Sequence, residues 1–275
     1  MINTANQSLL GKDSPYCSVY NPDLLFAIPR QEKRDELGFD LKTLPFSGVD
    51  VWTAYEISWL NLKGKPNAMV AEFTFSANAP FLVESKSFKL YLNSFNGSRF
   101  ESAEQVKGLM VKDLSGCSGK PVLIEFIALN NPKLSVNVLP GNNIDDLDIE
   151  IDEYTVNANL LRIDNSAKVV EETLNSHLLK SNCLVTSQPD WGSVVIHYVG
   201  KPIEQEGLLK YLISFREHNE FHEQCVERIF TDLIAHCQPQ KLTVYARYVR
   251  RGGLDINPFR SNFEAPYLMS RLSRQ

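Results

Sequence analysis

The apolar positions in the first half of the chain predict two strands, a helix and a third strand. Residues 68–96 are rich in Phe, Val and Tyr around a Pro-containing turn, which indicates two strands. A helix is expected from Ser102 to Leu114, because Ser102 and Gln105 stand at the spacing of a capping box. Residues 121–129 form a continuous apolar run, which indicates a strand buried on both faces.

The second half of the chain repeats this order of elements. Residues 182–200 predict a strand, a turn and a strand, and residues 241–253 predict a closing strand. Between them we expect a long helical region from about Ile203 to Cys237. Its apolar residues recur at helical spacing and predict one buried face: Leu208, Leu209, Leu212, Ile213, Phe215, Val226, Ile229, Phe230 and Leu233.

The repeat predicts an α+β fold, in which two tandem modules each have an antiparallel sheet with helices packed on one face. Residues 141–154 are acidic and turn-rich, so we place the boundary near residue 150, between modules 1–150 and 151–275. A coincidental likeness of two mixed segments is the alternative explanation. No GxGxxG motif follows a predicted strand, so a bound dinucleotide would not use the Rossmann glycine turn.

The composition is that of an ordinary soluble protein, with 43% hydrophobic and 22% charged residues in 275. The net charge of −5 disfavours a nucleic-acid surface but leaves a free nucleobase open as a ligand. Residues 1–14 contain no apolar leader core and no stretch could span a membrane, so we expect a cytoplasmic protein. Five cysteines without a CxxC pair suggest neither a disulfide framework nor a zinc ribbon.

The segment SNCLVTSQPDWG pairs a thiol with a carboxyl. Cys183 enters a short strand, and Asp190 follows seven positions later on a turn, so a hairpin could bring a nucleophile and an acid together. A structural explanation stays open for each residue. A free cysteine is commonly a small buried hydrophobe, and an aspartate before Trp-Gly can close an Asx-turn.

The segment HNEFHEQCVE places His218 and His222 on one helical face, with Cys225 three residues further along. These residues could bind zinc, although the HExxH pattern is absent and capping or core histidines are more common. Glu223 could instead accept hydrogen bonds from the paired N–H donors of a polar ligand, or it could be a solvated surface residue.

The segment VESKSFKLYLNSF reads as a strand with an unusual distribution of charge. Glu84 and Lys86 would share a face with Phe88 and Leu90, whereas strand alternation should separate polar from apolar residues. A ligand at the start of this strand would explain the charges. An edge strand protected by lysines, with Lys89 among them, would also explain them.

The segment YARYVRRGG places three arginines, Arg247, Arg250 and Arg251, before Gly252 and Gly253 at the end of a strand. Glycines allow close backbone approach, and guanidinium groups bind phosphate through two parallel hydrogen bonds. A phosphorylated cofactor is therefore one interpretation, and an ordinary basic edge with a turn is the other.

Together these segments resemble the QueF family of NADPH-dependent 7-cyano-7-deazaguanine reductases, in its long, two-module branch. The resemblance spans almost the whole chain, and ESKSFKLYLNSF is the highly specific signature of the family. The other matching blocks occur in the order of the family: LPFSGVDVWTAYEISWLN, VVEETLNSHLLKSNCLVTSQPDWGS, SFREHNEFHEQCVERIF and YARYVRRGGLDINPFRSN.

The resemblance implies a tunnelling fold and the reduction of a nitrile to a primary amine, with two NADPH per turnover and no required metal, on the route to the tRNA nucleoside queuosine. It also implies a homodimer with a small deazapurine substrate and no nucleic-acid or membrane partner. The roles it implies are catalysis by Cys183, Asp190 and His222, base binding by Val83, Glu84, Ser85, His222 and Glu223, and NADPH binding by Ser85, Lys86, Arg251 and Gly252.

Two other functions stay open. One is a zinc-dependent cyclohydrolase of the same fold, with Cys183, His222 and Cys225 as metal ligands. The other is a protein that binds a purine or pterin without turnover.

Overall fold

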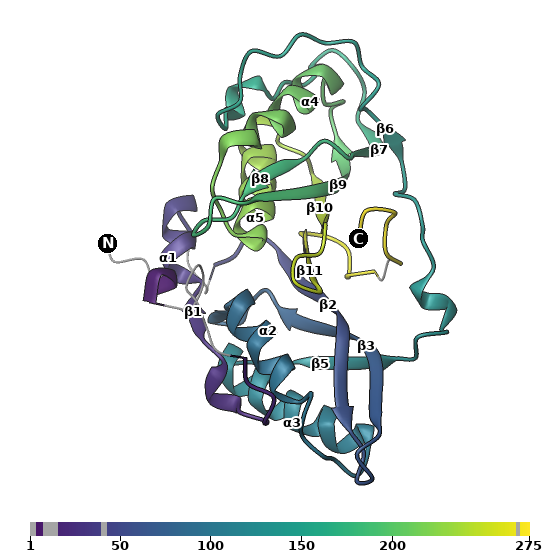
Figure 1. The fold of residues 1–275 in the computed structure, drawn as a ribbon. Helices are drawn as coiled ribbons and strands as arrows, with labels where there is room; N and C mark the ends of the chain where they lie inside the picture. Colours follow the sequence, from purple (N-terminus) through teal and green to yellow (C-terminus); the bar gives the residue numbers. More distant parts are fainter. Residues whose placement is uncertain (1–3, 8–15, 40–42, 268–269) are drawn as a thin grey trace. The chain divides into compact units, whose positions relative to one another are not determined.

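The computed structural model describes residues 4–7, 16–39, 43–267 and 270–275 (Figure 1). Most of the segment 1–14, in which we expect no leader, lies outside these residues. The chain forms two compact units, each built from separate stretches of sequence. Unit 1 comprises Met1–Thr43, Asp50–Ser135 and Arg250–Asp255, and unit 2 comprises Leu44–Val49, Val136–Val249 and Ile256–Gln275.

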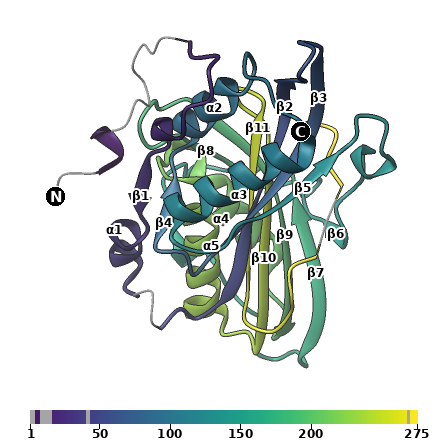
Figure 2. The same ribbon diagram turned by 90° about the horizontal axis from the view of Figure 1, so that it is seen from below.

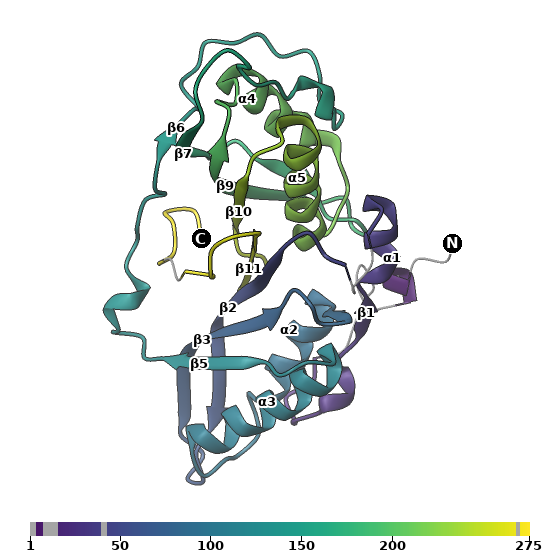
Figure 3. The same ribbon diagram turned by 180° about the vertical axis from the view of Figure 1, so that it is seen from behind.

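Unit 1 contains a sheet in the order β5-β3-β2 and the two-stranded pair β1-β4. Strand β3 runs antiparallel to β5, with Glu72 opposite Glu125, and helix α3 packs against β5 (Figure 3). The helices are α1 (Gln31–Arg34), α2 (Ser85–Ser94) and α3 (Ala103–Ser118). The strands are β1 (Ala27–Pro29), β2 (Ser47–Leu60), β3 (Pro66–Ser76), β4 (Phe81–Val83) and β5 (Leu123–Ile127).

Unit 2 contains strands in the order β11-β10-β9-β7-β6, and β8 pairs with β9. Strands β7, β9 and β10 run side by side (Figure 2), and α5 lies along β10 (Figure 3). The helices are α4 (Gln205–Ile213) and α5 (His222–Cys237). The strands are β6 (Asn142–Asn143), β7 (Val170–Ser176), β8 (Lys180–Asn182), β9 (Pro189–Gly200), β10 (Lys241–Tyr248) and β11 (Leu254–Ser261).

Short 3-10 helices occur between these elements. They span Thr4–Gln7, Pro22–Leu24, Asp35–Leu37, Pro132–Leu134, Ala158–Leu160 and Ser214–Glu217. The antiparallel sheets and their packed helices confirm the predicted α+β class. The module boundary near residue 150 stays a prediction.

The segment ESKSFKLYLNSF forms helix α2, so the predicted strand is wrong. Glu84 caps this helix by accepting hydrogen bonds from the backbone N–H groups of Lys86 and Ser87. Phe88, Tyr91, Leu92 and Phe95 are buried at a spacing of three and four residues, which is the period of a helix. A carboxylate cap before an apolar helical repeat therefore overrides the β propensity of Phe and Tyr.

Two further predictions need correction. Strand β5 alternates, with Leu123 70% exposed and Ile124 6% exposed, so it is buried on one face only. The helical region 203–237 is interrupted by the 3-10 turn Ser214–Glu217 and the extended residues that follow it. The Ser102 cap of α3 is confirmed, since its Oγ accepts a hydrogen bond from Gln105 N–H at 3.1 Å.

The two helix pairs are held by the same contacts. The Tyr91 hydroxyl of α2 donates to Asp113 Oδ2 of α3 at 2.8 Å, and the Tyr211 hydroxyl of α4 donates to Asp232 Oδ2 of α5 at 2.6 Å. The phenylalanine four positions after each tyrosine packs edge-on against its ring, with centroids 5.3 Å apart. The predicted repeat therefore extends to individual side-chain contacts.

Candidate active site

The hairpin of β8 and β9 places Cys183 and Asp190 on one face of unit 2. Ser181 lies directly opposite Asp190, and Cys183 N–H donates to Gln188 O at 2.8 Å, which extends the pairing beyond β8. Side chains two residues apart share a face of a strand, so Cys183 and Ser181 point the same way. Cys183 is therefore a diagonal neighbour of Asp190 on the same face of the hairpin.

Both reactive groups are buried, with Cys183 9% exposed and Asp190 4% exposed. The burial of Asp190 does not come from the neighbouring indole, because Trp191 points to the opposite face and is 39% exposed. Trp191 instead lies under the guanidinium of Arg216, 5.6 Å from its ring centroid. A residue that does contact the Asp190 carboxylate is His222, at the start of α5.

The loop before α5 is joined to the hairpin by three hydrogen bonds to one residue. Asn182 N–H donates to His218 O at 2.8 Å, and Glu220 N–H donates to Asn182 O at 3.0 Å. The Asn182 side chain donates to Asn219 Oδ1 at 3.2 Å. This parallel bridge brings the first residue of α5, His222, to the hairpin.

The His222 imidazole lies against the carboxylate. Its Nε2 is 3.2 Å from Asp190 Oδ2, and its ring is stacked on Tyr248 with centroids 4.0 Å apart and planes at 15°. Among the described residues, neither ring nitrogen makes a hydrogen bond of normal geometry. The structure therefore brings Asp190 and His222 together as a buried pair, close enough for a proton to pass between carboxylate and imidazole.

Glu223 lies in the first turn of α5 and is 4% exposed. The residue at the cap position, Phe221, offers no side-chain acceptor to the helix N-terminus. A carboxylate at this end of a helix is stabilised by the helix dipole, so Glu223 can remain charged although buried. The predicted solvated alternative for Glu223 is wrong.

The base-binding residues predicted in unit 1 lie at the junction of β4 and α2. Val83 and Glu84 are buried, at 4% and 2% exposure. The Glu84 carboxylate accepts from Lys86 N–H at 2.7 Å and Ser87 N–H at 2.8 Å, and Ser85 Oγ lies 3.4 Å from Oε1. Burial raises the pKa of Glu84 above its ordinary value of 4.5, although these N–H groups act to lower it.

The predicted cofactor residues Arg251 and Gly252 form an exposed turn of unit 1. Arg251 N–H donates to Leu254 O at 2.8 Å, and Leu254 N–H donates to Arg251 O at 3.1 Å. The two residues between them, Gly252 and Gly253, have φ of +56° and +78°. Left-handed backbone at both positions favours glycine and exposes the turn backbone to a ligand.

The turn and helix α2 are linked through one carboxylate. A Cβ atom on Gly253 would lie 2.6 Å from the carboxyl carbon of Glu56, so the turn packs closely on this residue. Glu56 also forms an ion pair with Lys89 of α2. Since Lys86 precedes Lys89 by three residues, both lysines lie on the same side of the helix.

The three arginines of the predicted basic edge have different environments. Arg247 is 4% exposed and donates to Gln275 Oε1 at 3.0 Å and to Tyr245 OH at 2.8 Å, so it has a structural role. The Arg250 guanidinium stacks on the ring of Tyr55, 4.2 Å from its centroid. Arg251 is exposed at the turn, where the predicted phosphate contact needs it.

Comparison with known proteins matches these segments to one family. Residues 16–126 match the family model described as "Nitrile reductase, 7-cyano-7-deazaguanine-reductase N-term", and residues 189–267 match the model described as "QueF-like protein". A protein of Hydrogenovibrio crunogenus is 66% identical over 273 residues, which cover 99% of this chain and 98% of that protein. Its name is NADPH-dependent 7-cyano-7-deazaguanine reductase. The chain belongs to the QueF nitrile reductase family.

A relative in Ralstonia nicotianae with the same name is 57% identical over 262 residues, which cover 94% of this chain and 95% of that protein. Among solved structures, an archaeosine synthase described as QueF-Like aligns with 37% of this chain and 100% of its own, at a TM-score of 0.31 and 17% identity. The family assignment rests on the full-length sequence matches, which also identify the chain as an oxidoreductase.

The zinc site considered from the sequence is not assembled in this nitrile reductase. Cys225 is fully buried, and burial, followed by the charge of Glu220, raises the pKa of its thiol to about 12. His218 lies 3.1 Å from Glu220, which also pairs with Arg228. Within residues 4–7, 16–39, 43–267 and 270–275, no group of three or more His, Cys, Asp or Glu side chains could hold a metal.

Unit 1 contains a second hairpin and a second helix start. They are joined by the same backbone hydrogen bonds as the hairpin of β8 and β9 and the start of α5. Leu60 N–H donates to Ser98 O at 2.9 Å, and Phe100 N–H donates to Leu60 O at 2.9 Å. These bonds correspond to the pair that joins Asn182 to the loop before α5. Leu60 is therefore the counterpart of Asn182, and the residues after each can be compared directly.

The counterpart of Cys183 is Asn61. Asn61 donates its N–H across its turn at 2.9 Å, as Cys183 does at 2.8 Å. Each turn ends with a positive-φ residue, Gly64 at 85° and Ser187 at 53°. Counting from these turns and from the two helix starts, Cys183, Asp190 and His222 correspond to Asn61, Asn67 and Ala103.

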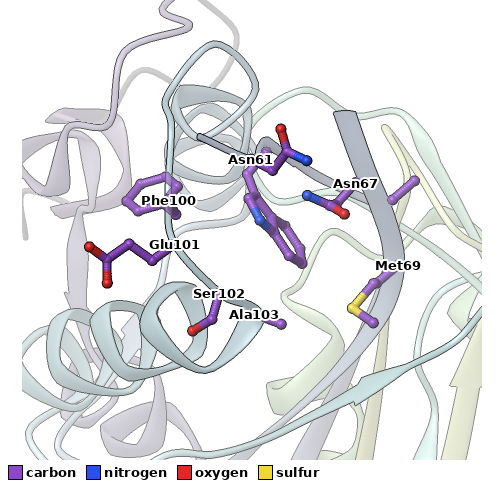
Figure 4. Close-up of a pocket in the computed structure, with 9 residues that line it drawn as sticks. Asn61, Asn67, Met69, Phe100, Glu101, Ser102 and Ala103 are labelled. Atoms are coloured by element: carbon purple, nitrogen blue, oxygen red, sulfur yellow. The ribbon is translucent and has the colours of Figure 1, made fainter. Parts of the chain in front are cut away.

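These three counterparts line one pocket of unit 1, which has a volume of about 240 Å³ (Figure 4). Figure 4 shows Asn61 and Asn67 among the side chains that line this pocket, and by the count above they correspond to Cys183 and Asp190. Among the nine residues that line this pocket there is neither a cysteine nor a histidine. The hairpin and helix start are therefore duplicated, and the combination of thiol, carboxylate and imidazole at these positions occurs in unit 2.

Three residues not singled out from the sequence neighbour Asp190, His222 or Tyr248: one pairs with Asp190, one is stacked on His222, and one pairs with Tyr248. They are Ser181, Gly192 and Tyr248, none of which belongs to a catalytic residue type in a recognisable pattern. Only strand pairing and the ring contact reveal their proximity, because they come from three different strands.

Proposed function

We propose that this chain reduces the nitrile of 7-cyano-7-deazaguanine to the aminomethyl group with NADPH, in the biosynthesis of queuosine. The observation that supports this most is the arrangement of Cys183, Asp190 and His222 in unit 2, with the His222 Nε2 3.2 Å from the Asp190 carboxylate. The names of the full-length relatives agree with it.

The first step joins the enzyme to the substrate. Cys183 loses its proton to Asp190, and the thiolate forms a C–S bond with the nitrile carbon. One π bond of the nitrile breaks, and its electron pair takes the proton from Asp190 at nitrogen. The product is a thioimide, whose C=N carbon accepts hydride more readily than the nitrile does.

Asp190 and His222 then handle the protons of the reduction. NADPH supplies two hydrides in sequence, so that one nitrile, two NADPH and two protons give one amine and two NADP⁺. After the first reduction the C–S bond breaks to give an iminium and the Cys183 thiolate, and Asp190 takes a proton from the iminium nitrogen and passes it to the sulfur, which leaves the neutral imine for the second reduction. We assign delivery of the remaining protons to His222, which shares Asp190 as its carboxylate partner.

The residues of unit 1 fit a phosphorylated cofactor. Arg251 is exposed beside Gly252, where a Cβ atom would meet nothing within 4 Å, so the turn leaves room for a ligand. Lys86 lies on the side of α2 that carries Lys89, which is linked to this turn through Glu56. We propose that Lys86 and Arg251 bind the phosphates of NADPH, with Ser85 and Gly252 as polar and backbone contacts.

Two carboxylates are suited to the deazaguanine edge, which presents an exocyclic amine and a ring N–H. We assign Glu84 and Glu223 to accept these hydrogen bonds, with Val83, Ser85 and His222 as further contacts. Both carboxylates are buried, at 2% and 4% exposure, so each depends on N–H donors for its charge.

We also propose that the protein acts in the cytoplasm as a homodimer of two-module chains, each with modules 1–150 and 151–275. The matched tyrosine–aspartate contacts of the two helix pairs support the repeat. Within the part of the chain that the structure describes, no helix is long and apolar enough to cross a membrane. Analytical ultracentrifugation at several protein concentrations tests the dimer.

Turnover provides the direct test of the function. Purified protein mixed with NADPH and 7-cyano-7-deazaguanine should oxidise two NADPH for each aminomethyl product, both measured in the same sample. A protein that binds the base without turnover would give no NADPH oxidation. Formation of a hydrolysis product, with a rate that depends on added zinc, would show a cyclohydrolase instead.

A further inference from the structure

The ring of Tyr248 lies between His222 and the backbone of Gly192. Tyr248 is the direct cross-strand partner of Gly192, and its ring is stacked on His222 at 4.0 Å. A Cβ atom on Gly192 would lie 3.1 and 3.2 Å from two carbons of the ring, so there is no spare room on that side. The ring therefore cannot move away from the imidazole.

The other end of Tyr248 is buried beside a thiol and a hydroxyl. Tyr248, Ser181 and Cys225 are all 0% exposed. Burial raises the pKa of Tyr248 well above its ordinary value, the neighbouring Cys225 raises it further, and Ser181 acts to lower it. Among the described residues, neither hydroxyl has a hydrogen-bond partner of normal geometry, which is a cost to stability that an apolar residue would avoid.

The backbone of Tyr248 is fixed as well. Its carbonyl accepts a hydrogen bond from Gln275 Nε2 at 3.0 Å, and the next residue, Val249, donates its N–H to Trp191 O at 2.8 Å. Gln275 is only 3% exposed and also accepts from Arg247, so this support is itself buried. The backbone and the ring of Tyr248 are therefore both held in place.

The duplicated scaffold of unit 1 provides an internal comparison. Its hairpin, helix start and closing strand are built without a tyrosine or a hydroxyl at these positions. Counting from the matched hairpins, helix starts and strand pairs gives four correspondences between the units: Ser181 with Trp59, Gly192 with Met69, Cys225 with Val106, and Tyr248 with Ala128. These four residues therefore accompany Cys183, Asp190 and His222 in unit 2. The same arrangement of hairpin, helix start and strand forms in unit 1 without them.

We propose that Tyr248 is a positioning residue, whose clamped ring fixes the plane of the His222 imidazole so that Nε2 faces the Asp190 carboxylate. This inference rests on the proposed function of Asp190 and His222. Without the ring, the His222 side chain gains room to turn away from Asp190. Misplacing a catalytic group by about 1 Å can slow a reaction on the order of 100-fold.

The test compares three variants in single-turnover experiments that follow covalent adduct formation and the subsequent reduction. Tyr248→Leu removes the ring and should slow the reduction about 10- to 100-fold, with the affinity for the nitrile changed less than about 3-fold. Tyr248→Phe keeps the ring and should remain within about 3-fold of the wild type. Tyr245→Leu removes an equally buried tyrosine of the same strand and should leave the rates unchanged.

A second perturbation keeps the tyrosine and moves its ring. Gly192→Ala places a methyl group against Tyr248 and should also slow the reduction. If Gly192 acts through the ring, this substitution should have no further effect in the Tyr248→Leu background. The Gly192→Ala variant also provides the test if Tyr248→Leu does not fold.

Three results would overturn the proposal. They are a folded Tyr248→Leu protein with wild-type rates, a Tyr248→Phe protein as slow as Tyr248→Leu, and a Gly192→Ala protein with wild-type rates. Failure of the wild-type protein to form an adduct or oxidise NADPH would instead refute the proposed function, so the two failures are distinguishable.

Discussion

At the residue scale, the Asp190 carboxylate is buried 3.2 Å from an imidazole, with the thiol of Cys183 diagonal to it on the same hairpin. A carboxyl that contacts an imidazole and has a thiol at the diagonal position of its hairpin is suited to proton transfer in both directions of the proposed reaction. The position of Asp190 therefore explains why a proton-transfer role is assigned to it, separately from base binding.

Asp190→Asn should slow adduct formation on the order of 100-fold or more, because an amide cannot take the thiol proton. Base binding should be retained, since the assigned base contacts are other residues. Rapid-mixing measurements of adduct formation and calorimetric titration with the nitrile separate these effects. A variant that loses affinity but keeps the adduct rate would contradict the proton-transfer role.

The raised pKa of Glu84 predicts that base binding depends on pH. Its pKa is raised above 4.5 by burial, and the base donates N–H groups to the ionised form, so affinity should increase as the pH rises through the raised pKa. The same group stabilises the fold below its unfolded pKa, and this contribution is lost as the pH rises through the folded pKa.

Binding titrations from pH 4.5 upward test this for the wild type and two variants. Glu84→Gln should remove the dependence, whereas Glu104→Gln, at an exposed position in the first turn of α3, should keep it. If the affinity for the base changed equally with pH in all three proteins, Glu84 would not be the carboxylate that binds the base.

Among the residues, sequence alone identified the candidates but not their contacts. Cys183 and Asp190 could be paired because one hairpin contains both, and the resemblance to the family supplied their roles. Tyr248 could not be found this way, since its importance depends on a ring contact between β10 and the start of α5.

At the scale of elements, the start of α3 and the start of α5 differ in their caps. Ser102 Oγ accepts from Gln105 N–H, and Gln105 in turn accepts from Glu101 N–H at 2.8 Å, whereas Phe221 leaves α5 without a side-chain cap. The start of α3 is capped by side chains. The start of α5 has no side-chain cap, so its backbone N–H donors remain near Glu223.

Ser102→Ala should therefore lower the free energy of unfolding by about 1 kcal/mol, through loss of the cap of α3. Catalysis should be unaffected, because this helix start carries no reactive group. Urea unfolding and steady-state rates measured on the same preparation check both expectations. A loss of activity without a loss of stability would mean that the unit 1 pocket takes part in the reaction.

Periodicity predicted most of these elements, and it failed where a cap decided the outcome. The capping box of α3 is visible as Ser102 and Gln105, so this helix was predicted correctly. The start of α2 is capped by a glutamate through its own carboxylate, a weaker sequence signal, and β propensity suggested a strand. The break after α4 has no proline or glycine to mark it.

At the scale of the whole molecule, each compact unit joins separate stretches of sequence. In unit 2, buried Arg260 of β11 donates to Glu227 of α5 at 2.8 Å and to Val49 O at 3.1 Å, so one side chain joins three stretches. The repeat predicts tandem modules 1–150 and 151–275, which stays a prediction, whereas each compact unit takes up separate stretches of the chain. The placement of residues 44–49 in unit 2 could not be predicted from the sequence, because it depends on contacts between residues more than 200 positions apart.

The central claim is that Cys183 forms a covalent bond with the nitrile, and intact mass spectrometry without NADPH tests it most directly. The wild-type protein should gain the mass of one 7-cyano-7-deazaguanine per chain, and Cys183→Ala should gain none. Cys225→Ala, which removes one of the two buried thiols of α5, should keep the adduct. An adduct that persists in Cys183→Ala would contradict the assignment of the nucleophile.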